Sequence, residues 1–150
     1  MAESLHDQNP LVLIIMKGGF VFANELLKNC NFPLEVDYIH ATRYQDSVSG
    51  NELEWKVAVP KAVAGRTVLV IDDIYDEGVT LKAVIEEVEA SGAQSVKTAV
   101  FVVKEHERNY GGIAPDFIAA SVPDEYVFGF GMDYQGYWRN APGIYAVKGL

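Results

Sequence analysis

The feature that most constrains this sequence is a buried strand that runs through an acidic turn into a helix. Residues 68–81 read VLVIDDIYDEGVTL, and the first four are apolar and mostly β-branched. Such a run is typical of a strand that is covered on both faces. Apolar residues then recur from Leu81 at i, i+3, i+4 and i+7, the spacing of a helix stripe, up to Ser91-Gly92. The stretch therefore predicts a strand, a turn and a helix in direct succession.

Strands and helices alternate along the rest of the chain. Residues 20–29 have the apolar spacing of a helix, and residues 104–122 have the character of loops. Further strands are expected at 11–15, around 36–38, at 57–59, 96–103 and 144–147. This alternation predicts an α/β domain with a mainly parallel, twisted sheet flanked by helices.

Composition narrows the class of protein. A chain of 150 residues that is 49% hydrophobic can bury one sizeable core. Its net charge of −9 argues against nucleic-acid binding. Cys30 has no second cysteine to pair with, the N-terminus lacks signal-peptide features, and the apolar run 11–16 is too short to cross a bilayer. We therefore expect a cytoplasmic protein that binds neither nucleic acid nor membrane.

The acidic turn has the chemistry of a phosphate-sugar site. Ligands of open α/β sheets bind at the carboxyl ends of strands, and a helix N-terminus there attracts an anion. Gly78 allows close approach of the backbone, and Thr80 offers a hydroxyl. Asp72, Asp73 and Asp76 offer carboxylates to sugar hydroxyls, magnesium or a proton. The alternative, in which these residues only cap the helix or face solvent, requires all five to coincide by chance.

Other sites that use paired acids fit less well. A DDxxD magnesium motif belongs on a helix, whereas a strand precedes this one. A response-regulator receiver needs a further Asp at the end of a later strand, and none lies between Thr80 and Lys104. The motifs GxGxxG, GxxxxGK[ST], HExxH and GxSxG are absent.

Three segments resemble type I phosphoribosyltransferases. Residues 68–81 resemble the signature that binds phosphoribosyl pyrophosphate (PRPP), and residues 15–20, IMKGGF, resemble the pyrophosphate loop. Residues 123–134, PDEYVFGFGMDY, followed by YWR at 137–139, resemble the purine hood of hypoxanthine-guanine phosphoribosyltransferases. The resemblance implies the type I phosphoribosyltransferase fold as a single domain, with a core over about 10–122 and a small C-terminal hood over about 123–150.

For PRPP, the resemblance implies a role at each matching position. Asp76 would be the catalytic general base beside the purine N7, and Asp72 and Asp73 would hold ribose hydroxyls and the waters of a first Mg²⁺. Arg139 would contact pyrophosphate, and the Met16–Lys17 peptide is often cis in this family. The implied PRPP-binding residues are Lys17, Gly18, Asp72, Asp73, Asp76, Glu77, Gly78, Val79, Thr80 and Arg139.

For the purine, the resemblance points to the hood and the strand before it. Lys104 would donate to the 6-oxygen, Tyr126 would stack on the ring, and Val127 would bind its edge through the backbone. Asp133 would lie at the purine site and bind a second Mg²⁺. Arg43 and Tyr44 would begin a lid that spans Thr42–Glu54.

Some residues allow a plainer interpretation. Lys17 and Lys104 could be ordinary surface lysines, and Asp133 could simply pair with Arg139. Cys30 is expected to be a packed small residue. The histidines at 6, 40 and 106 have no metal-ligand spacing and are expected to be structural or exposed.

Two departures from the family pattern concern the pocket. Glu77 stands where the signature has Thr or Ser, so its carboxylate is expected to turn away from the phosphate, toward solvent or a cation. The chain also begins later than the pattern, without an N-terminal helix and strand that help to form the hood.

The resemblance implies a reaction and its partners. Hypoxanthine or guanine would react with PRPP to give IMP or GMP and pyrophosphate, with Mg²⁺ as cofactor, in a homodimer or homotetramer. Two alternatives remain: a xanthine-preferring purine phosphoribosyltransferase and a non-catalytic PRPP-sensing regulator on the same fold.

Overall fold

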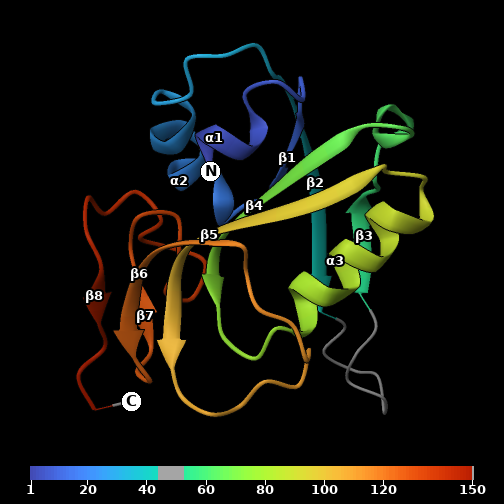
Figure 1. Cartoon of the computed structure of the whole chain (residues 1–150). Coiled ribbons are helices and arrows are strands. Elements are labelled where there is room, and N and C mark those ends of the chain that lie inside the picture. The colour runs from blue at the N-terminus through green and yellow to red at the C-terminus, as the bar shows by residue number, and fades with distance from the viewer. Residues whose placement is uncertain (44–52, 150) are drawn as a thin grey trace.

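The computed structural model describes residues 1–43 and 53–149, and within these residues six strands form one sheet (Figure 1). The sheet order is β3-β2-β1-β4-β5-β6, and only the β2–β3 pair is antiparallel. The strands are β1 (Leu11–Ile15), β2 (Glu35–Arg43), β3 (Leu53–Val57), β4 (Thr67–Tyr75), β5 (Ser95–Glu105) and β6 (Phe117–Pro123). The prediction of a mainly parallel α/β sheet is confirmed.

Helices cover both faces of the sheet (Figure 1). On one face lie α1 (Ala2–Leu5) and α2 (Gly19–Leu27), packed on Val12 and Leu69. On the other face lies α3 (Val79–Ala90), together with the 3-10 turn Lys61–Val63, packed on alternate strand residues such as Leu13 and Val70. Side chains alternate across a strand, so each central strand fills both layers. Burying each such side chain stabilises the fold by about 1.5–3 kcal/mol.

The chain changes direction across the sheet at β1 and β4. From β1 it continues through α2 to β2 on one side, and from β4 through α3 to β5 on the other. Neighbouring strands whose connections leave in opposite directions create a crevice at their carboxyl ends. The fold therefore places its natural ligand site beyond Ile15 and Tyr75.

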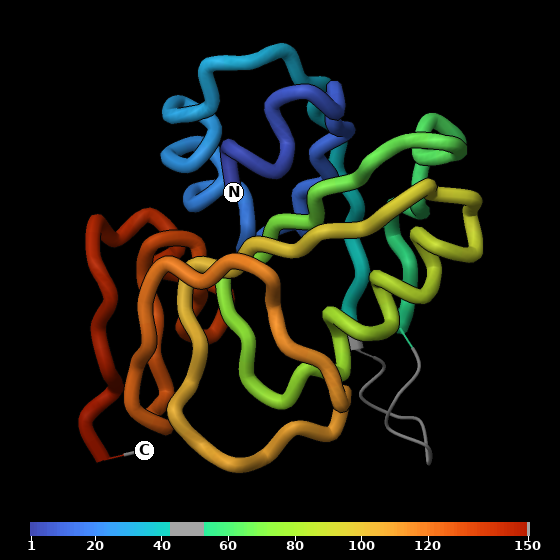
Figure 2. The backbone as a smooth tube through the Cα atoms, viewed as in Figure 1, coloured from blue at the N-terminus to red at the C-terminus, as the bar shows by residue number. Residues whose placement is uncertain are grey.

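The C-terminal segment from residue 124 onward, called the hood below, lies beside β5 and β6. Its strands β7 (Val127–Phe128) and β8 (Tyr145–Ala146) pair antiparallel. Val127 and Met132 pack on Val102 and Val122 of the sheet. Figure 2 shows that the N-terminus lies by the helices, while the C-terminus lies at the end of the hood.

The structure differs from the sequence predictions at several elements. β4 continues to Tyr75, so the two acids do not end the strand but lie within it. β3 covers 53–57 rather than 57–59, and β6 was expected to be loop. β6 lies at the edge of the sheet, ends in Pro123 and leaves Ile118 about half exposed. An edge strand need not be buried on both faces, and its sequence therefore need not be the long apolar run that marks a central strand.

The predicted lid lies mostly outside the described residues, which omit Tyr44 and its neighbours up to residue 52. The two ends of the predicted range belong to strands, because Thr42 pairs with Glu54 and Arg43 with Leu53. No helix in the described ranges is long and apolar enough to span a membrane.

Candidate active site

Asp72 and Asp73 form a buried carboxylate pair in β4, with only 9% and 8% of their surfaces exposed. The Asp73 N–H donates to Asp72 Oδ1 over 2.9 Å. Burial raises the pKa of both carboxyl groups, and the adjacent charge of Asp73 raises the pKa of Asp72 further. Two acids that are costly to ionise side by side favour a neighbouring positive charge.

The loop after β1 lies directly against this pair. The Met16–Lys17 peptide is cis, as the family resemblance led us to expect. A β carbon at Gly18 would overlap the Asp73 carboxylate, and one at Gly19 would lie 2.7 Å from the carbonyl oxygen of Ile71. The two glycines therefore allow the β1 loop to touch β4 at the sheet crevice.

The turn after β4 presents the start of α3 to the same crevice. Gly78, at the N-terminal boundary of α3, has φ +78°, a conformation that disfavours side chains, and a β carbon there would lie 2.7 Å from the Tyr75 hydroxyl. Its carbonyl accepts the Lys82 N–H over 3.0 Å. In general, the first N–H groups of a helix point out of its N-terminal end, and this arrangement favours anions.

A polar cavity of about 440 Å³ opens at this crevice. Its lining comes from residues 15–18, 40–42 and 72–78, with Lys56, Thr80, Leu81, Asp133 and Arg139. All predicted PRPP residues lie in this lining except Val79, which is the first residue of α3. His40 and Lys56 also line the cavity, although the sequence did not indicate them. They lie in β2 and β3. Because side chains alternate between the two faces of a strand, the alternation along these strands was the sequence pattern from which their direction could have been predicted.

A second cavity of about 210 Å³ adjoins the first. It is lined by Asp73, Ile74, Asp76, Lys104, Tyr126, Val127, Met132 and Asp133. All four predicted purine residues are therefore brought together from β5 and the hood. The two cavities share Asp73, Ile74, Asp76 and Asp133.

Asp76 lies at this shared wall with cationic and hydrogen-bonding partners. Lys104 Nζ is 3.1 Å from its Oδ2, and His106 Nε2 is 2.5 Å from its Oδ1. Burial acts to raise the pKa of Asp76, but the hydrogen bonds from His106 and Lys104 outweigh burial and lower it. Asp76 is therefore held as a carboxylate. The His106 side chain is buried, as that of a structural histidine would be, but its contact with the expected base was not predicted. Its position two residues after Lys104 was the available signal.

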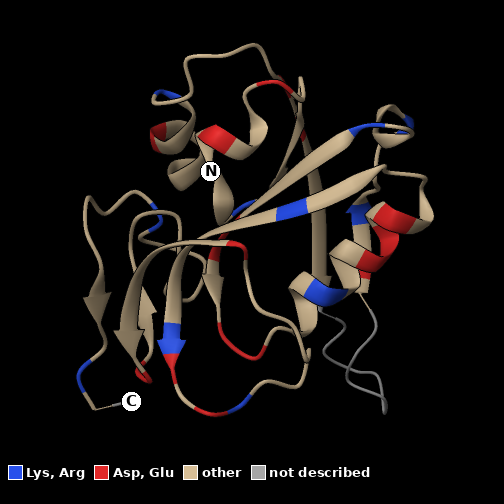
Figure 3. Ribbon diagram, in the orientation of Figure 1, with Lys and Arg blue, Asp and Glu red and all other residues tan. Residues whose placement is uncertain are grey.

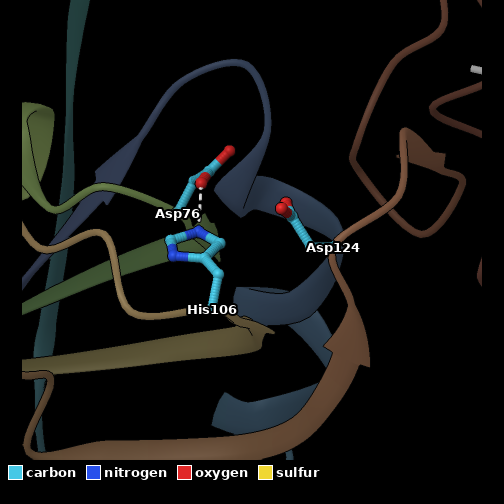
Figure 4. Close-up of side chains that lie close together, drawn as sticks. All are labelled: Asp76, His106 and Asp124. Atoms are coloured by element: carbon cyan, nitrogen blue, oxygen red, sulfur yellow. Dashed lines mark hydrogen bonds and ion pairs between the residues drawn. The ribbon is translucent and has the colours of Figure 1, made fainter.

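Arg108 connects the loop after β5 to neighbouring acids. It binds Asp124 with two hydrogen bonds of 2.8 Å, and its Nε lies 3.7 Å from Glu77 Oε1. Figure 4 shows the carboxylates of Asp76 and Asp124 close to the His106 ring, with a dashed line that joins Asp76 to the ring. The Glu77 carboxylate therefore has a cation beside it, and Glu77 also lines the larger cavity. That its carboxylate turns away from the phosphate stays a prediction.

Arg139 joins the hood to the carboxylate pair. Its Nη2 lies 2.7 Å from Asp133 Oδ1, and its Nη1 donates to the carbonyl of Gly131 over 2.7 Å. Nη1 is also 3.9 Å from Asp73 Oδ2. Arg139 thus pairs with Asp133 and still lines the larger cavity.

The acids around the cavities fit a hard divalent cation. Figure 3 shows acidic segments along the end of β4 and the following turn. Asp72, Asp73 and Asp133 offer only oxygen donors, the ligands that Mg²⁺ prefers. Within the described residues, the cationic group within 4.0 Å of this pair is Arg139, 3.9 Å from Asp73 Oδ2, so a divalent cation would favour ionisation of both carboxyl groups.

The fold and site define an α/β protein with a polar cavity at the carboxyl edge of a mainly parallel sheet, beside a second cavity lined in part by the hood. The chain belongs to the phosphoribosyltransferase family: the family model for the phosphoribosyl transferase domain matches residues 1–135.

Individual relatives place the chain within this family. It is 36% identical over 149 residues to a hypoxanthine-guanine phosphoribosyltransferase of Lactococcus lactis, covering 99% of this chain and 80% of that protein. It is 33% identical to one of Bacillus subtilis, covering 99% and 82%. A hypoxanthine phosphoribosyltransferase structure from Staphylococcus aureus superposes with a TM-score of 0.90 at 25% identity, covering 98% of this chain and 80% of that chain.

Proposed function

We propose that this protein transfers the 5-phosphoribosyl group of PRPP to hypoxanthine or guanine, giving IMP or GMP and pyrophosphate. The observation that carries the proposal is the pair of cavities that meet at Asp76. A transfer between two substrates needs two adjoining pockets with the reacting atoms at their boundary. The curated relatives named above support the choice of substrates.

The larger cavity is proposed to bind PRPP. The N–H groups at the start of α3, with Thr80, would hold the 5′-phosphate, and the backbone around Gly18 would hold pyrophosphate. Asp72 and Asp73 would accept hydrogen bonds from the ribose hydroxyls. Arg139 is placed to offset the negative charge of pyrophosphate, since it lines the same cavity.

The smaller cavity is proposed to bind the purine. Tyr126 would stack on the ring, the backbone of Val127 would bind its edge, and Lys104 would donate to the 6-oxygen. Asp76, between the cavities, would accept the proton of N7 as the bond from N9 to the ribose forms. The hydrogen bonds that lower the pKa of Asp76 keep it ionised and ready to accept that proton.

Mg²⁺ is proposed as the cofactor, with the waters of a first ion held by Asp72 and Asp73 and a second ion bound by Asp133. When bound, Mg²⁺ would neutralise charge on the pyrophosphate that leaves. The protein's own residues bind and orient both substrates and hold the proton acceptor. We further propose a cytoplasmic homodimer or homotetramer, which light scattering of the purified protein would check.

The direct test is release of pyrophosphate from PRPP and Mg²⁺ with hypoxanthine, guanine, xanthine, orotate or uracil. We expect turnover with hypoxanthine and guanine and none with the two pyrimidines. Omission of Mg²⁺ and substitution Asp76→Asn are the matched controls. Turnover with xanthine alone would show that xanthine is the substrate in place of hypoxanthine and guanine. PRPP binding without turnover on any base would reject the proposal that the protein is an enzyme.

A further inference from the structure

The two carboxylate oxygens of Asp76 have different partners. Oδ2 faces Lys104, which lines the smaller cavity, whereas Oδ1 is bound by His106, which is not among the described lining residues of either cavity. Arg108 Nη2 lies farther from Oδ1, at 3.7 Å. The His106 side chain is only 7% exposed. One oxygen is thus directed to the pocket, and the other is backed by a buried imidazole (Figure 4).

The orientation of the His106 ring is set by its own backbone neighbour. The Arg108 N–H donates to His106 Nδ1 over 3.1 Å, so Nδ1 is the unprotonated nitrogen. The ring proton therefore resides on Nε2 and is donated to Asp76 Oδ1. A ring held at both nitrogens fixes the plane of the carboxylate that it contacts.

Among the described residues, the acidic groups near this hydrogen bond each lie beside the Arg108 guanidinium. Asp124 approaches the ring, but its two oxygens are engaged by the Arg108 guanidinium. Glu77 Oε1 lies 3.7 Å from Arg108 Nε. Lys104 on β5 contacts Oδ2 rather than Oδ1. The loop after β5 also donates from Gly111 N–H to the Glu77 carbonyl, and it runs toward the start of α3 in Figure 2.

We infer that His106 is a positioning residue, which holds Oδ1 of Asp76 so that Oδ2 accepts the purine proton. This inference rests on the proposed function. Lys104 leaves Oδ2 for the purine 6-oxygen, and His106 keeps the carboxylate in place. The N7 proton then passes to Oδ2, the bond from N9 to C1′ forms, and the C1′–oxygen bond breaks with its electron pair going to pyrophosphate. His106 neither gains nor loses a proton.

Two substitutions separate positioning from simple structural support. In His106→Gln the amide reaches Asp76 from the place of Nε2 but loses the acceptor for Arg108 N–H. In His106→Asn the side-chain oxygen still accepts that N–H, but the amide is too short to reach Asp76. His6→Gln, at an exposed position on α1's boundary, is the control. The readouts are kcat and KM for PRPP and for hypoxanthine, and the pKa of the Asp76 carboxyl by carbon NMR.

We expect His106→Asn to lower kcat by about 10–100-fold, with little change in KM for PRPP, because a misplaced base slows only the chemical step. His106→Gln should retain most of the turnover, and the control all of it. The pKa of Asp76 should rise toward its ordinary value in the Asn variant and not in the Gln variant. The inference would be overturned if His106→Asn turned over as fast as His106→Gln or faster, or if both variants kept the wild-type turnover.

The same experiment distinguishes this inference from the proposed function. Wild-type protein that transfers to no purine rejects the proposed function. The NMR comparison then still decides whether His106 holds Asp76, since an unchanged pKa in His106→Asn overturns that contact. Active wild-type protein with unaffected variants rejects the positioning role alone.

Discussion

Gly18, in the loop after β1, lies so close to Asp73 of β4 that a β carbon at Gly18 would overlap all three heavy atoms of the Asp73 carboxyl group. The two residues are far apart in sequence and meet because β1 and β4 are adjacent parallel strands. Asp73 is buried, so its carboxylate has little room to move aside. The contact makes the shape of the larger cavity depend on the absence of a side chain at residue 18.

Gly18→Ala should therefore raise the KM for PRPP by at least about tenfold and destabilise the fold by about 1–3 kcal/mol, as overpacking does. Kinetics at varied PRPP and urea unfolding measure the two effects. Gly143→Ala is the matched control, because a β carbon there meets atoms no closer than 3.7 Å. Equal behaviour of the two variants would contradict the prediction.

Asp76→Asn should preserve folding and PRPP binding and lower turnover by about 10²–10⁴-fold, the usual cost of losing a general base. The amide fits the same space but cannot accept the N7 proton. Single-turnover kinetics and PRPP titration separate the two steps. Asp7→Asn, at an exposed carboxylate, is the control. Turnover within about threefold of wild type would remove Asp76 from the role of base.

Asp133→Asn should raise the Mg²⁺ concentration that gives half-maximal activity. Asparagine can still accept the Gly136 N–H that Asp133 Oδ2 binds over 2.7 Å, so the local turn is retained while the charge is lost. An Mg²⁺ titration of both proteins is the measurement. An unchanged Mg²⁺ dependence would leave Asp133 as the ion-pair partner of Arg139, with no part in metal binding.

Glu77→Thr should strengthen PRPP binding only modestly, by about 0.5–1.5 kcal/mol, the value of one recovered hydroxyl contact. The reason is that Arg108 Nε lies 3.7 Å from Glu77 Oε1, so this cation offsets the negative charge that Glu77 brings to the lining of the larger cavity. The KM for PRPP at fixed Mg²⁺ tests this. An improvement of a hundredfold or more, about 2.7 kcal/mol, would mean that the carboxylate faces the phosphate.

Asp116→Ala should destabilise the protein at neutral pH by about 1–3 kcal/mol, because the buried Thr98 N–H loses its acceptor at 2.8 Å. Burial acts to raise the pKa of Asp116, but hydrogen bonds from Thr98 and Lys97 lower it below the ordinary 3.8. Because the pKa is lower in the folded state, ionised Asp116 stabilises the fold at pH values above its ordinary pKa. This stabilisation is lost as the pH falls through the folded-state pKa.

Urea unfolding of wild-type protein and Asp116→Ala at neutral and at strongly acidic pH measures that change. The stability difference should be largest at neutral pH and shrink in acid. A difference that stays constant with pH would show that the ionised carboxylate is not what holds Thr98.

The local sequence determined the elements whose residues carry their own signal. Continuous apolar runs predicted β1, the first part of β4 and most of β5, and the apolar stripe predicted α3. The same stretches predicted that Asp76 and Gly78 would follow a strand and open a helix. Burial on both faces and helical periodicity are encoded by neighbouring residues, so they can be read without knowing the rest of the fold.

Only the tertiary structure decided which distant side chains meet. His106 lies just after β5, and it meets Asp76 because β5 is parallel to β4, which the spacing of two residues from Lys104 does not reveal by itself. The edge strand β6 was missed because neither a long apolar run nor strict alternation marks it. Contacts between strands depend on sheet order and register, which arise from packing of the whole chain rather than from any one segment.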